Sequence, residues 1–267
     1  MKITVSSTAS PRIMYEACPL CTSKALNTLR SADCTKHDLY NPVIGPVMTW
    51  KQCAICQHVF TDGYFTDATC KVIFSKTHEN QRTGSDIERQ RYISAKMVEK
   101  VLPYAQDGHW LDVGFGNGSL LFTAQEYGFT PVGIDLRQSN VDTLKQFGIE
   151  AHNIDLRKHT HPARYAVISM ADVLEHMPYP KEGLAAAHAL TRKDGVLLLS
   201  MPNSDSMLWR AMDMSNANPY WGEIEHYHNF GRPRLYALLK ECGFEPLKYG
   251  ISERYRVCME VVARKIG

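Results

Sequence analysis

The sequence lacks long apolar runs and a strong excess of either charge. No stretch of its 267 residues approaches the roughly 18 consecutive apolar residues that a membrane-spanning helix needs. The opening residues 1–10, MKITVSSTAS, contain no apolar segment typical of a secretion signal. The formal net charge of +2 lacks the basic excess of most dedicated nucleic-acid-binding proteins. We therefore expect a cytoplasmic protein with no membrane partner, and the charge argues against DNA or RNA as a ligand.

Eight cysteines are present, and their positions are informative. A reducing cytosol makes structural disulfides rare, which leaves metal binding, redox chemistry or burial as explanations. Four of the cysteines form two Cys-x-x-Cys pairs before residue 60: Cys18, Cys21, Cys53 and Cys56. Two such pairs can supply the four thiolates of a tetrahedral Zn²⁺ site, so we predict zinc there.

Two alternatives to this simple zinc site stay open. Cys34 and His37 lie between the two pairs, so a mixed ligand set or a second, weaker site is compatible with the sequence. Redox chemistry is the other alternative, although neither pair opens a helix within a βαβ unit, as thioredoxin-like motifs do.

The chain divides into a small first domain and a larger second one. Residues 12–75 hold six of the eight cysteines and only short β-like runs, such as 59–60 and 71–74, so they cannot build a large core. The second domain is expected over 76–267. It should open with a helix, because Ser85 and Glu88 have the spacing of a capping box.

From residue 110 onward, short apolar runs alternate with helical patterns. The runs read as strands that are covered on both faces, so we predict a doubly wound and largely parallel sheet. Two final extended runs, 245–249 and 256–264, are joined by a short turn and predict an antiparallel pair. The other strands are expected at 110–113, 132–134, 166–168 and 196–199, and the helices at 119–128, 138–147, 181–192 and 232–242.

A glycine-rich turn follows the first of these strands, over residues 112–119. A dinucleotide-binding fingerprint would need its third glycine at Ser119, but here the glycine comes one residue earlier, at Gly118. The turn, which reads DVGFGNGS, resembles motif I of class I S-adenosylmethionine (SAM)-dependent methyltransferases, acidic-x-Gly-x-Gly-x-Gly. The resemblance implies a Rossmann-like α/β fold with a seven-stranded, mostly parallel sheet and SAM as cofactor.

Two aspartates further along support the resemblance. Asp135 ends the second strand, where a carboxylate can accept hydrogen bonds from both ribose hydroxyls of an adenosine group. Asp155 falls where the family often places an acidic residue near the adenine amino group, although a helix cap is a serious alternative for it. The cofactor-binding residues that the resemblance implies are Asp112, Gly114, Phe115, Gly116, Gly118, Asp135, Leu136, Asp155 and Ala171.

Three further segments resemble known methyltransferases. The segment 172–176, DVLEH, is similar to one found after the fourth strand of small-molecule enzymes, including ubiquinone-pathway and sugar-modifying members. Residues 225–244 are similar to a later family segment, H-x-H-x-F followed by L-L-x-x-x-G-F. The cysteine-rich start resembles the zinc ribbon that precedes certain sugar and polyketide-type methyltransferases.

Methyl transfer from a sulfonium requires a positioned nucleophile and a group that removes its proton. Among eleven histidines, those after the fourth and fifth strands are placed at the edge where doubly wound sheets bind ligands. We predict His226 as the principal base, with His176, His228 and Glu175 in supporting roles, although each could serve only packing or capping. The insert 204–230 is rich in methionine and aromatic residues and is interpreted as a substrate cover, or as a short helix near 205–214 that packs on the core or on a second subunit in a homodimer.

The predicted activity is O-methylation of a small molecule, either a sugar or another hydroxylated metabolite. C-methylation of a keto-sugar and methylation of RNA are the alternatives within the methyltransferases. An NAD(P)-dependent oxidoreductase is disfavoured by the position of the third glycine, and a noncatalytic zinc adaptor by the intact glycine turn. The acceptor atom and the oligomeric state are not determined by these patterns.

Overall fold

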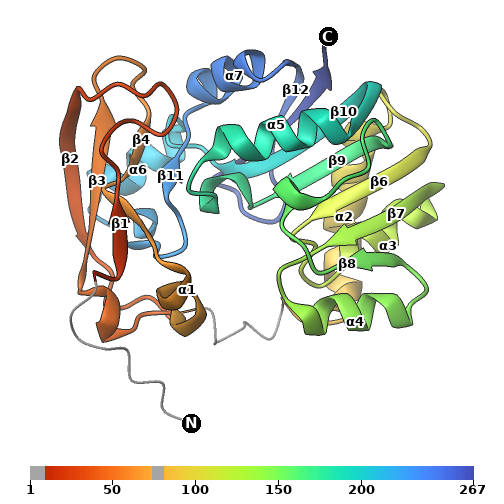
Figure 1. The fold of residues 1–267 in the computed structure, drawn as a ribbon, viewed down its shortest axis with the longest axis horizontal. Helices are drawn as coiled ribbons and strands as arrows, with labels where there is room; N and C mark the ends of the chain where they lie inside the picture. Colours follow the sequence, from red (N-terminus) through yellow and green to blue (C-terminus); the bar gives the residue numbers. More distant parts are fainter. Residues whose placement is uncertain (1–9, 74–80) are drawn as a thin grey trace. The chain divides into compact units, whose positions relative to one another are not determined.

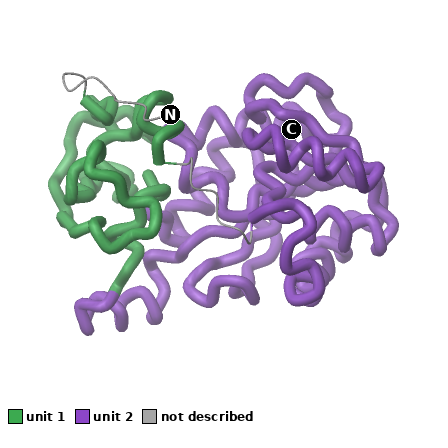
Figure 2. The backbone as a smooth tube through the Cα atoms, turned by 90° about the horizontal axis from the view of Figure 1, so that it is seen from below, with its two compact units in different colours: residues 1–76, 218–228 green, residues 77–217, 229–267 purple. Residues whose placement is uncertain are grey.

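The computed structural model describes residues 10–73 and 81–267. The chain forms two compact units: residues up to 76 together with 218–228, and residues 77–217 together with 229–267 (Figure 2). We call residues 218–228 the return segment. The predicted ranges, 12–75 and 76–267, differ from this division because they assign the return segment to the second domain. Their boundary, between residues 75 and 76, lies outside the described residues.

The first unit is built on a four-stranded sheet in the order β11-β4-β3-β2. Strands β1 and β5 form a separate antiparallel pair. The bounds are β1 Arg12–Met14, β2 Leu26–Asp33, β3 Val47–Cys53, β4 Val59–Thr61, β5 Gly63–Phe65 and β11 His228–Asn229, with the 3-10 helix η1 at Pro42–Ile44 and the α-helix α1 at Asp67–Ile73. Residues 71–73 were predicted to be β-like and are helical. The Thr66 hydroxyl accepts a hydrogen bond from the Thr69 amide at 3.2 Å and so caps this helix.

The core of the first unit includes the return segment. Ile224 and Tyr227 pack in one buried cluster with Leu39, Met48 and Phe65. The return segment also begins with a 3-10 helix, η5 (Pro219–Gly222). These buried side chains, far apart in the sequence, form the apolar contacts that neither part could make alone.

The second unit contains a seven-stranded sheet in the order β12-β13-β10-β9-β6-β7-β8 (Figure 1). The five strands from β10 to β8 are parallel, and β13 pairs antiparallel with both β10 and β12. This confirms the predicted doubly wound sheet and its antiparallel terminal pair. The bounds are β6 Gly108–Val113, β7 Phe129–Ile134, β8 Glu150–His152, β9 Tyr165–Ala171, β10 Thr191–Pro202, β12 Phe244–Ile251 and β13 Cys258–Lys265.

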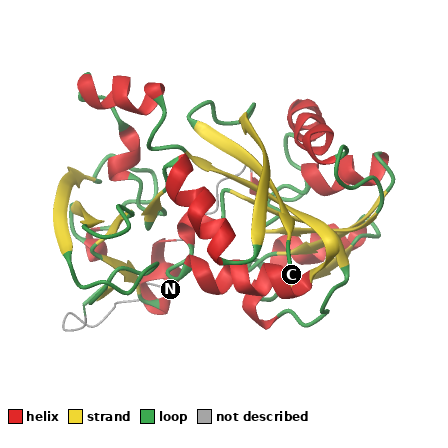
Figure 3. Ribbon diagram, turned by 90° about the horizontal axis from the view of Figure 1, so that it is seen from above, coloured by secondary structure: helices red, strands yellow, loops and turns green. Residues whose placement is uncertain are grey.

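Helices connect the strands and cover the sheet (Figure 3). Strand order reverses between β6 and β9, because β7 and β8 follow β6 in one direction while β9 and β10 proceed in the other. Ligands of doubly wound sheets bind at such a switch point, beyond the carboxyl ends of the strands. The helices are α2 Ile87–Val101, α3 Ser119–Glu126, α4 Gln138–Gln146, α5 Pro180–Leu190, α6 Met207–Met214 and α7 Arg232–Glu241, with short 3-10 turns η3 Leu156–Lys158 and η4 Leu174–His176.

The predicted capping box at the start of the second domain is wrong. Helix α2 begins at Ile87, after Asp86, whose backbone is left-handed with φ of 51°. The Ser85 hydroxyl donates to the carbonyl of Arg82 at 2.7 Å instead of capping the helix. A left-handed residue directly before the first turn prevents the extended N-cap geometry that a capping box requires.

Candidate functional site

The glycine turn joins β6 to α3 at the switch point. Gly114, Gly116 and Gly118 have φ of 65°, 55° and 80°, a left-handed conformation that side chains disfavour. A Cβ on Gly114 would also stand 3.1 Å from Cγ2 of Val173. The three glycines are therefore required by the backbone path. Their amides are held within the site: Gly114 donates to the carbonyl of Ile134 at 2.8 Å, Gly118 to that of Phe115 at 2.9 Å, and Gly116 to Asp135.

Asp135 ends β7 beside the glycine turn and is 4% exposed. Its Oδ2 accepts a hydrogen bond from the Gly116 amide at 3.3 Å. Arg137 donates to the same carboxylate from its backbone amide, Nε and Nη2 at 2.8, 3.0 and 2.8 Å. Leu136 lies between them and is 75% exposed, which leaves an apolar surface next to the carboxylate.

Asp155 repeats the arrangement of Asp135 one strand further out. It caps η3 through the amide of Arg157, and its carboxylate binds the Arg157 guanidinium at 2.9 and 2.8 Å. These hydrogen bonds with Arg157 hold the pKa of Asp155 below its ordinary value. Asp155 is thus a helix cap, as the alternative interpretation held, and a contact with adenine stays a prediction.

The remaining predicted cofactor residues line the ends of β6 and β9. Asp112 is buried, and its Oδ1 accepts from the Ser169 hydroxyl at 2.6 Å. Burial raises the pKa of Asp112 to about 7. Ala171 is half-buried at the end of β9, while the side chain of Phe115 packs in the core, so only its backbone is available to a ligand.

Past β9, the chain turns sharply and buries Glu175 on η4. Asp172 has φ of 55° and receives hydrogen bonds from the Ser200 hydroxyl and the Arg254 guanidinium. Among the described residues, neither carboxylate oxygen of Glu175 has a hydrogen-bond partner, and burial raises its pKa to about 8. His176 is half-buried, with Nε2 4.0 Å from Oε1 of Glu175.

The other two candidate histidines belong to the first unit, in the return segment. His226 is 8% exposed, and the ring of Tyr220 stacks near it at 6.4 Å between centroids. His228 is buried, and its Nδ1 lies 3.0 Å from Nε2 of His58. His226 and His228 thus belong to the first unit, and Glu175 and His176 belong to the second.

The four cysteines of the two pairs come together in the first unit. The sulfurs of Cys18 and Cys56 lie 3.6 Å apart, those of Cys21 and Cys53 3.5 Å apart, and all four fall within 4.8 Å of one another. All four are free thiols. Cys34 is separate from this cluster, because its sulfur instead faces the carbonyl of Gly45 at 3.6 Å.

His37 also lies outside the cysteine cluster. Its Nε2 contacts Oε1 of Glu223 at 2.5 Å, and its Nδ1 accepts the amide of Leu39 at 3.1 Å. An Nδ1 that accepts cannot carry a proton, so the neutral imidazole has its proton on Nε2, directed at Glu223. This tautomer makes His37 a hydrogen-bond donor to Glu223 in the return segment.

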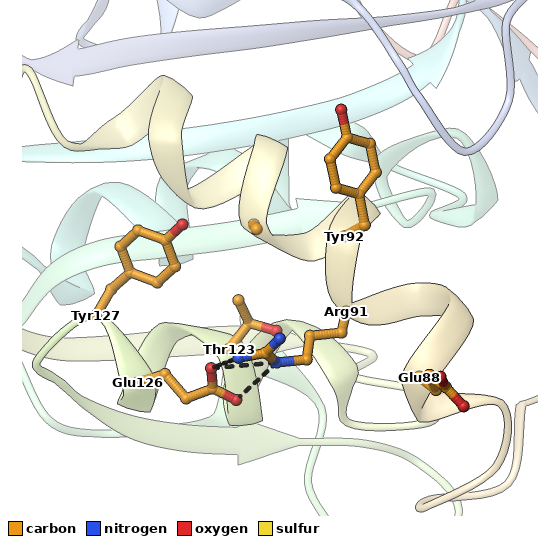
Figure 4. A pocket seen from close by; sticks show the side chains of 7 residues that line it. Glu88, Arg91, Tyr92, Thr123, Glu126 and Tyr127 are labelled. Atoms are coloured by element: carbon orange, nitrogen blue, oxygen red, sulfur yellow. Dashed lines mark hydrogen bonds and ion pairs between the residues drawn. The ribbon is translucent and has the colours of Figure 1, made fainter.

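A surface groove between α2 and α3 is separate from the predicted site residues (Figure 4). Arg91 and Glu126 bridge it through a forked ion pair, with Arg91 Nη2 2.5 Å from Oε2 of Glu126. None of the predicted cofactor, base or metal residues lines this groove, so it is not the candidate site. It is lined by Glu88, Arg91, Tyr92, Ala95, Thr123, Glu126 and Tyr127.

Sequence reasoning missed several polar partners at the site. Arg137 and Arg157 each follow an aspartate by two residues. The repeated sequence Asp-Leu-Arg could have indicated that each arginine pairs with the aspartate before it. Arg254 had no local signal, because it reaches Asp172 from the loop between β12 and β13.

None of the helices in the described part of the chain has the length and apolar character that a membrane-spanning helix requires.

A family whose description is "Methyltransferase domain" matches residues 86–249, which is more than half of the chain. The chain belongs to this methyltransferase family. Curated relatives include the ubiquinone biosynthesis O-methyltransferases of Saccharophagus degradans, 31% identical over 43% of this chain and 50% of that protein, and of Haemophilus ducreyi, 33% identical over 35% and 44%. This methyltransferase chain thus spans half or less of the length of these relatives.

Solved structures share the fold of the methyltransferase chain. The 1,6-didemethyltoxoflavin-N1-methyltransferase of Burkholderia thailandensis, determined with its substrate and S-adenosylhomocysteine, covers 81% of this chain and 99% of its own, at a TM-score of 0.57 and 19% identity. The PH0226 protein of Pyrococcus horikoshii covers 72% and 98%, with a TM-score of 0.57 and 15% identity. At these identities the likeness concerns the fold, which is the α/β class I methyltransferase fold.

Proposed function

We propose that this chain transfers the methyl group of SAM to a small hydroxylated molecule. The observation that carries the proposal is the hydrogen bond from the Gly116 amide to Oδ2 of Asp135, because it joins the glycine turn to the carboxylate at the switch point. SAM has no phosphate to neutralise, and its adenosine part offers two ribose hydroxyls to a carboxylate and a flat base to an apolar side chain. Asp135 and the exposed Leu136 have this chemistry.

SAM supplies an electrophilic methyl group, and the protein must provide binding, orientation and proton removal. Gly114, Gly116 and Gly118 carry no side chain, so the backbone of the turn allows the cofactor to approach closely. Asp112 and Ala171 lie at the ends of β6 and β9, the two strands that flank the switch point. We propose these residues, with Phe115 through its backbone and Asp155, as the cofactor-binding set.

We propose a histidine as the base that removes the proton of the acceptor. An imidazole has an unperturbed pKa near 6.5 and is therefore largely neutral, and able to accept a proton, near pH 7. His226 is the principal candidate, and His176, His228 and Glu175 have supporting roles. Glu175 is held in its protonated form by burial near neutral pH, so its part is to donate or hold a proton.

Oxygen is the proposed acceptor atom, because the curated relatives are named as O-methyltransferases. A sugar or another hydroxylated metabolite fits a site with a histidine base. Oxygen needs its proton removed as it attacks, whereas a tertiary amine would need no base.

We also propose that Cys18, Cys21, Cys53 and Cys56 bind one zinc ion with a structural role. Four sulfurs at 2.3 Å from a tetrahedral Zn²⁺ would lie about 3.8 Å from one another, by the geometry of the tetrahedron. The two closest pairs, at 3.5 and 3.6 Å, and the 4.8 Å limit for the whole set support this arrangement. A site closed by four thiolates leaves no open position for a substrate, which is the property of structural zinc.

The test is turnover with SAM labelled in its methyl group. The protein is incubated with a metabolite extract separated into classes, and the labelled product is identified by mass spectrometry. We expect label in a hydroxylated small molecule, linked through oxygen. Label only in RNA would contradict the proposed substrate class, and binding of NADH without binding of SAM would contradict the proposed activity.

A further inference from the structure

The return segment is held in the first unit by contacts along its whole length. Near its start, the Trp50 indole donates to the carbonyl of Trp221 at 2.8 Å. The carboxylate of Glu223 accepts a hydrogen bond from Nε2 of His37, and the amide of Thr61 donates to the carbonyl of Tyr227 at 2.9 Å. The segment that carries His226 is therefore shaped by the cysteine-containing unit.

Its last contact is the pair His58 and His228. Both side chains are 1% exposed, and Nε2 of one lies 3.0 Å from Nδ1 of the other. The planes of the two imidazoles differ by 26° with their centroids 5.1 Å apart, and the ring of Phe60 stacks on His58 at 5.8 Å. This buried hydrogen bond couples the tautomers of the two rings, because one of the two facing nitrogens must carry the proton and the other must accept it. The stacked ring of Phe60 restrains the plane of His58.

His58 is in turn tied to the cysteine cluster through the backbone. The Cys53 amide donates to the His58 carbonyl at 3.0 Å, and the Gln57 amide donates to the Cys53 carbonyl at 3.0 Å. Gln57 has φ of 59°, which closes this turn directly after Cys56. A metal bound by the four sulfurs would therefore hold both ends of the turn that positions His58.

We propose that His58 is a positioning residue, through which the four-cysteine site orients the side chain of His228 and thereby the return segment that bears His226. This inference rests on the proposed function, in which His226 is the base, and it gives the metal site a role beyond the stability of the small unit. His58 itself touches neither cofactor nor acceptor in this proposal. Its effect is carried by one hydrogen bond and by ring packing.

The experiment compares the zinc-loaded wild-type protein with three variants. His58→Phe keeps the ring and removes the hydrogen bond, whereas His58→Gln places an amide nitrogen near the position of Nε2. Phe60→Leu is the matched control, because it loosens packing on His58 and keeps the hydrogen bond. The readouts are the imidazole ¹⁵N shifts of His228, the rate at which diethyl pyrocarbonate modifies His226, and the affinity for S-adenosylhomocysteine.

We expect a single fixed tautomer of His228 in the wild type and in Phe60→Leu. His58→Phe should average the two tautomers and speed the modification of His226 by about threefold or more, because local opening becomes easier. His58→Gln should restore most of the wild-type behaviour. Removal of zinc from the wild type with a chelator should reproduce the effect of His58→Phe, and S-adenosylhomocysteine affinity should stay within about twofold throughout.

Unchanged ¹⁵N shifts and unchanged His226 reactivity in both His58→Phe and the zinc-free protein would overturn the inference. If His58→Phe does not fold, the zinc-free wild type and His58→Gln still decide it. A protein that holds no metal while His228 keeps one tautomer would overturn the part assigned to the metal. Failure of the proposed function is distinguishable, because it would show as absent SAM binding or as normal turnover of a His226 variant.

Discussion

The guanidinium of Arg137 and the carboxylate of Asp135 form a forked pair, with Nε 3.0 Å from Oδ1 and Nη2 2.8 Å from Oδ2. The amides of Arg137 and Gly116 bind the same two oxygens. A carboxylate has about four acceptor positions, so protein donors use all of them. Ribose hydroxyls that bind Asp135 must replace hydrogen bonds that Arg137 donates to this carboxylate. The affinity for the cofactor therefore depends on the difference between the hydrogen bonds from ribose and those lost from Arg137.

Substitution of Asp135 should weaken cofactor binding. We expect Asp135→Ala to reduce the affinity for S-adenosylhomocysteine at least about tenfold, since a hydrogen bond to a charged group contributes roughly 1.5–3 kcal/mol. Calorimetry gives the dissociation constants, with Asp142→Ala, on α4, as the control carboxylate. Equal affinity in wild type and Asp135→Ala would contradict the assignment of this residue to the ribose.

Removal of the metal should affect the first unit more than the second. Freshly purified protein is expected to hold about one zinc per chain, with Zn–S distances near 2.3 Å by X-ray absorption. Cys53→Ser should lower the zinc content, whereas Cys242→Ser, which changes a thiol outside the cluster, should not. Hydrogen exchange should then rise in residues 10–73 and 218–228 first. Zinc-free protein with its thiols paired as disulfides would refute the site.

Replacement of the principal base should lower turnover without loss of cofactor. His226→Asn is expected to reduce kcat by roughly 10²–10⁴-fold, the range that general-base catalysis provides, with SAM affinity nearly unchanged. His161→Asn is the control, because this exposed histidine lies outside the proposed site. Near-normal turnover of His226→Asn from pH 6 to 9 would transfer the role to His176 or His228, which are tested in the same way.

Stability should fall with rising pH because of Glu175. Its pKa is about 8 in the folded protein, above the ordinary value of 4.5, so between these values the folded state holds a proton that the unfolded state has lost. The contribution of this group is therefore complete below pH 4.5 and decreases as the pH rises towards 8, by at most about 1.4 kcal/mol per pH unit.

Glu175→Gln should remove this dependence and make the variant more stable than the wild type at pH 8, with the difference shrinking towards pH 5. Urea unfolding at several pH values measures it, and Glu99→Gln, at an exposed position on α2, is the control. A wild type whose stability does not decline between pH 5 and 8 relative to Glu175→Gln would contradict the assigned protonation of Glu175.

The sheet of the second unit was predictable because its strands are buried on both faces. Val196 to Leu199 and Ala166 to Ile168 are unbroken apolar runs, which are the sequence pattern of strands covered on both faces. β8 was missed, since three residues, Glu150–His152, carry too little pattern. The glycine turn and Asp135 were identified because their spacing is local.

The return segment could not be predicted, for a physical reason. Its contacts join residues such as His58 and His228, which are 170 positions apart, and contacts of this separation leave no local pattern. Asp172 and Arg254, 82 positions apart, were missed for the same reason. The insert 204–230 was read as one functional stretch, whereas the structure divides it between α6 in the second unit and the return segment in the first.

The return segment also makes the two units inseparable by a simple cut. The chain leaves the first unit near residue 76, comes back at 218 and leaves again after 228, so the small unit is assembled from two distant pieces of polypeptide. A truncated protein that begins at residue 77 would lack the apolar neighbours that bury Ile224 and Tyr227. Because these side chains would then be exposed, such a fragment should aggregate instead of behaving as an independent catalytic domain. During synthesis the first 76 residues must therefore wait for a segment that lies about 140 positions further along the chain, and the small unit can be completed only after residue 228 has been made.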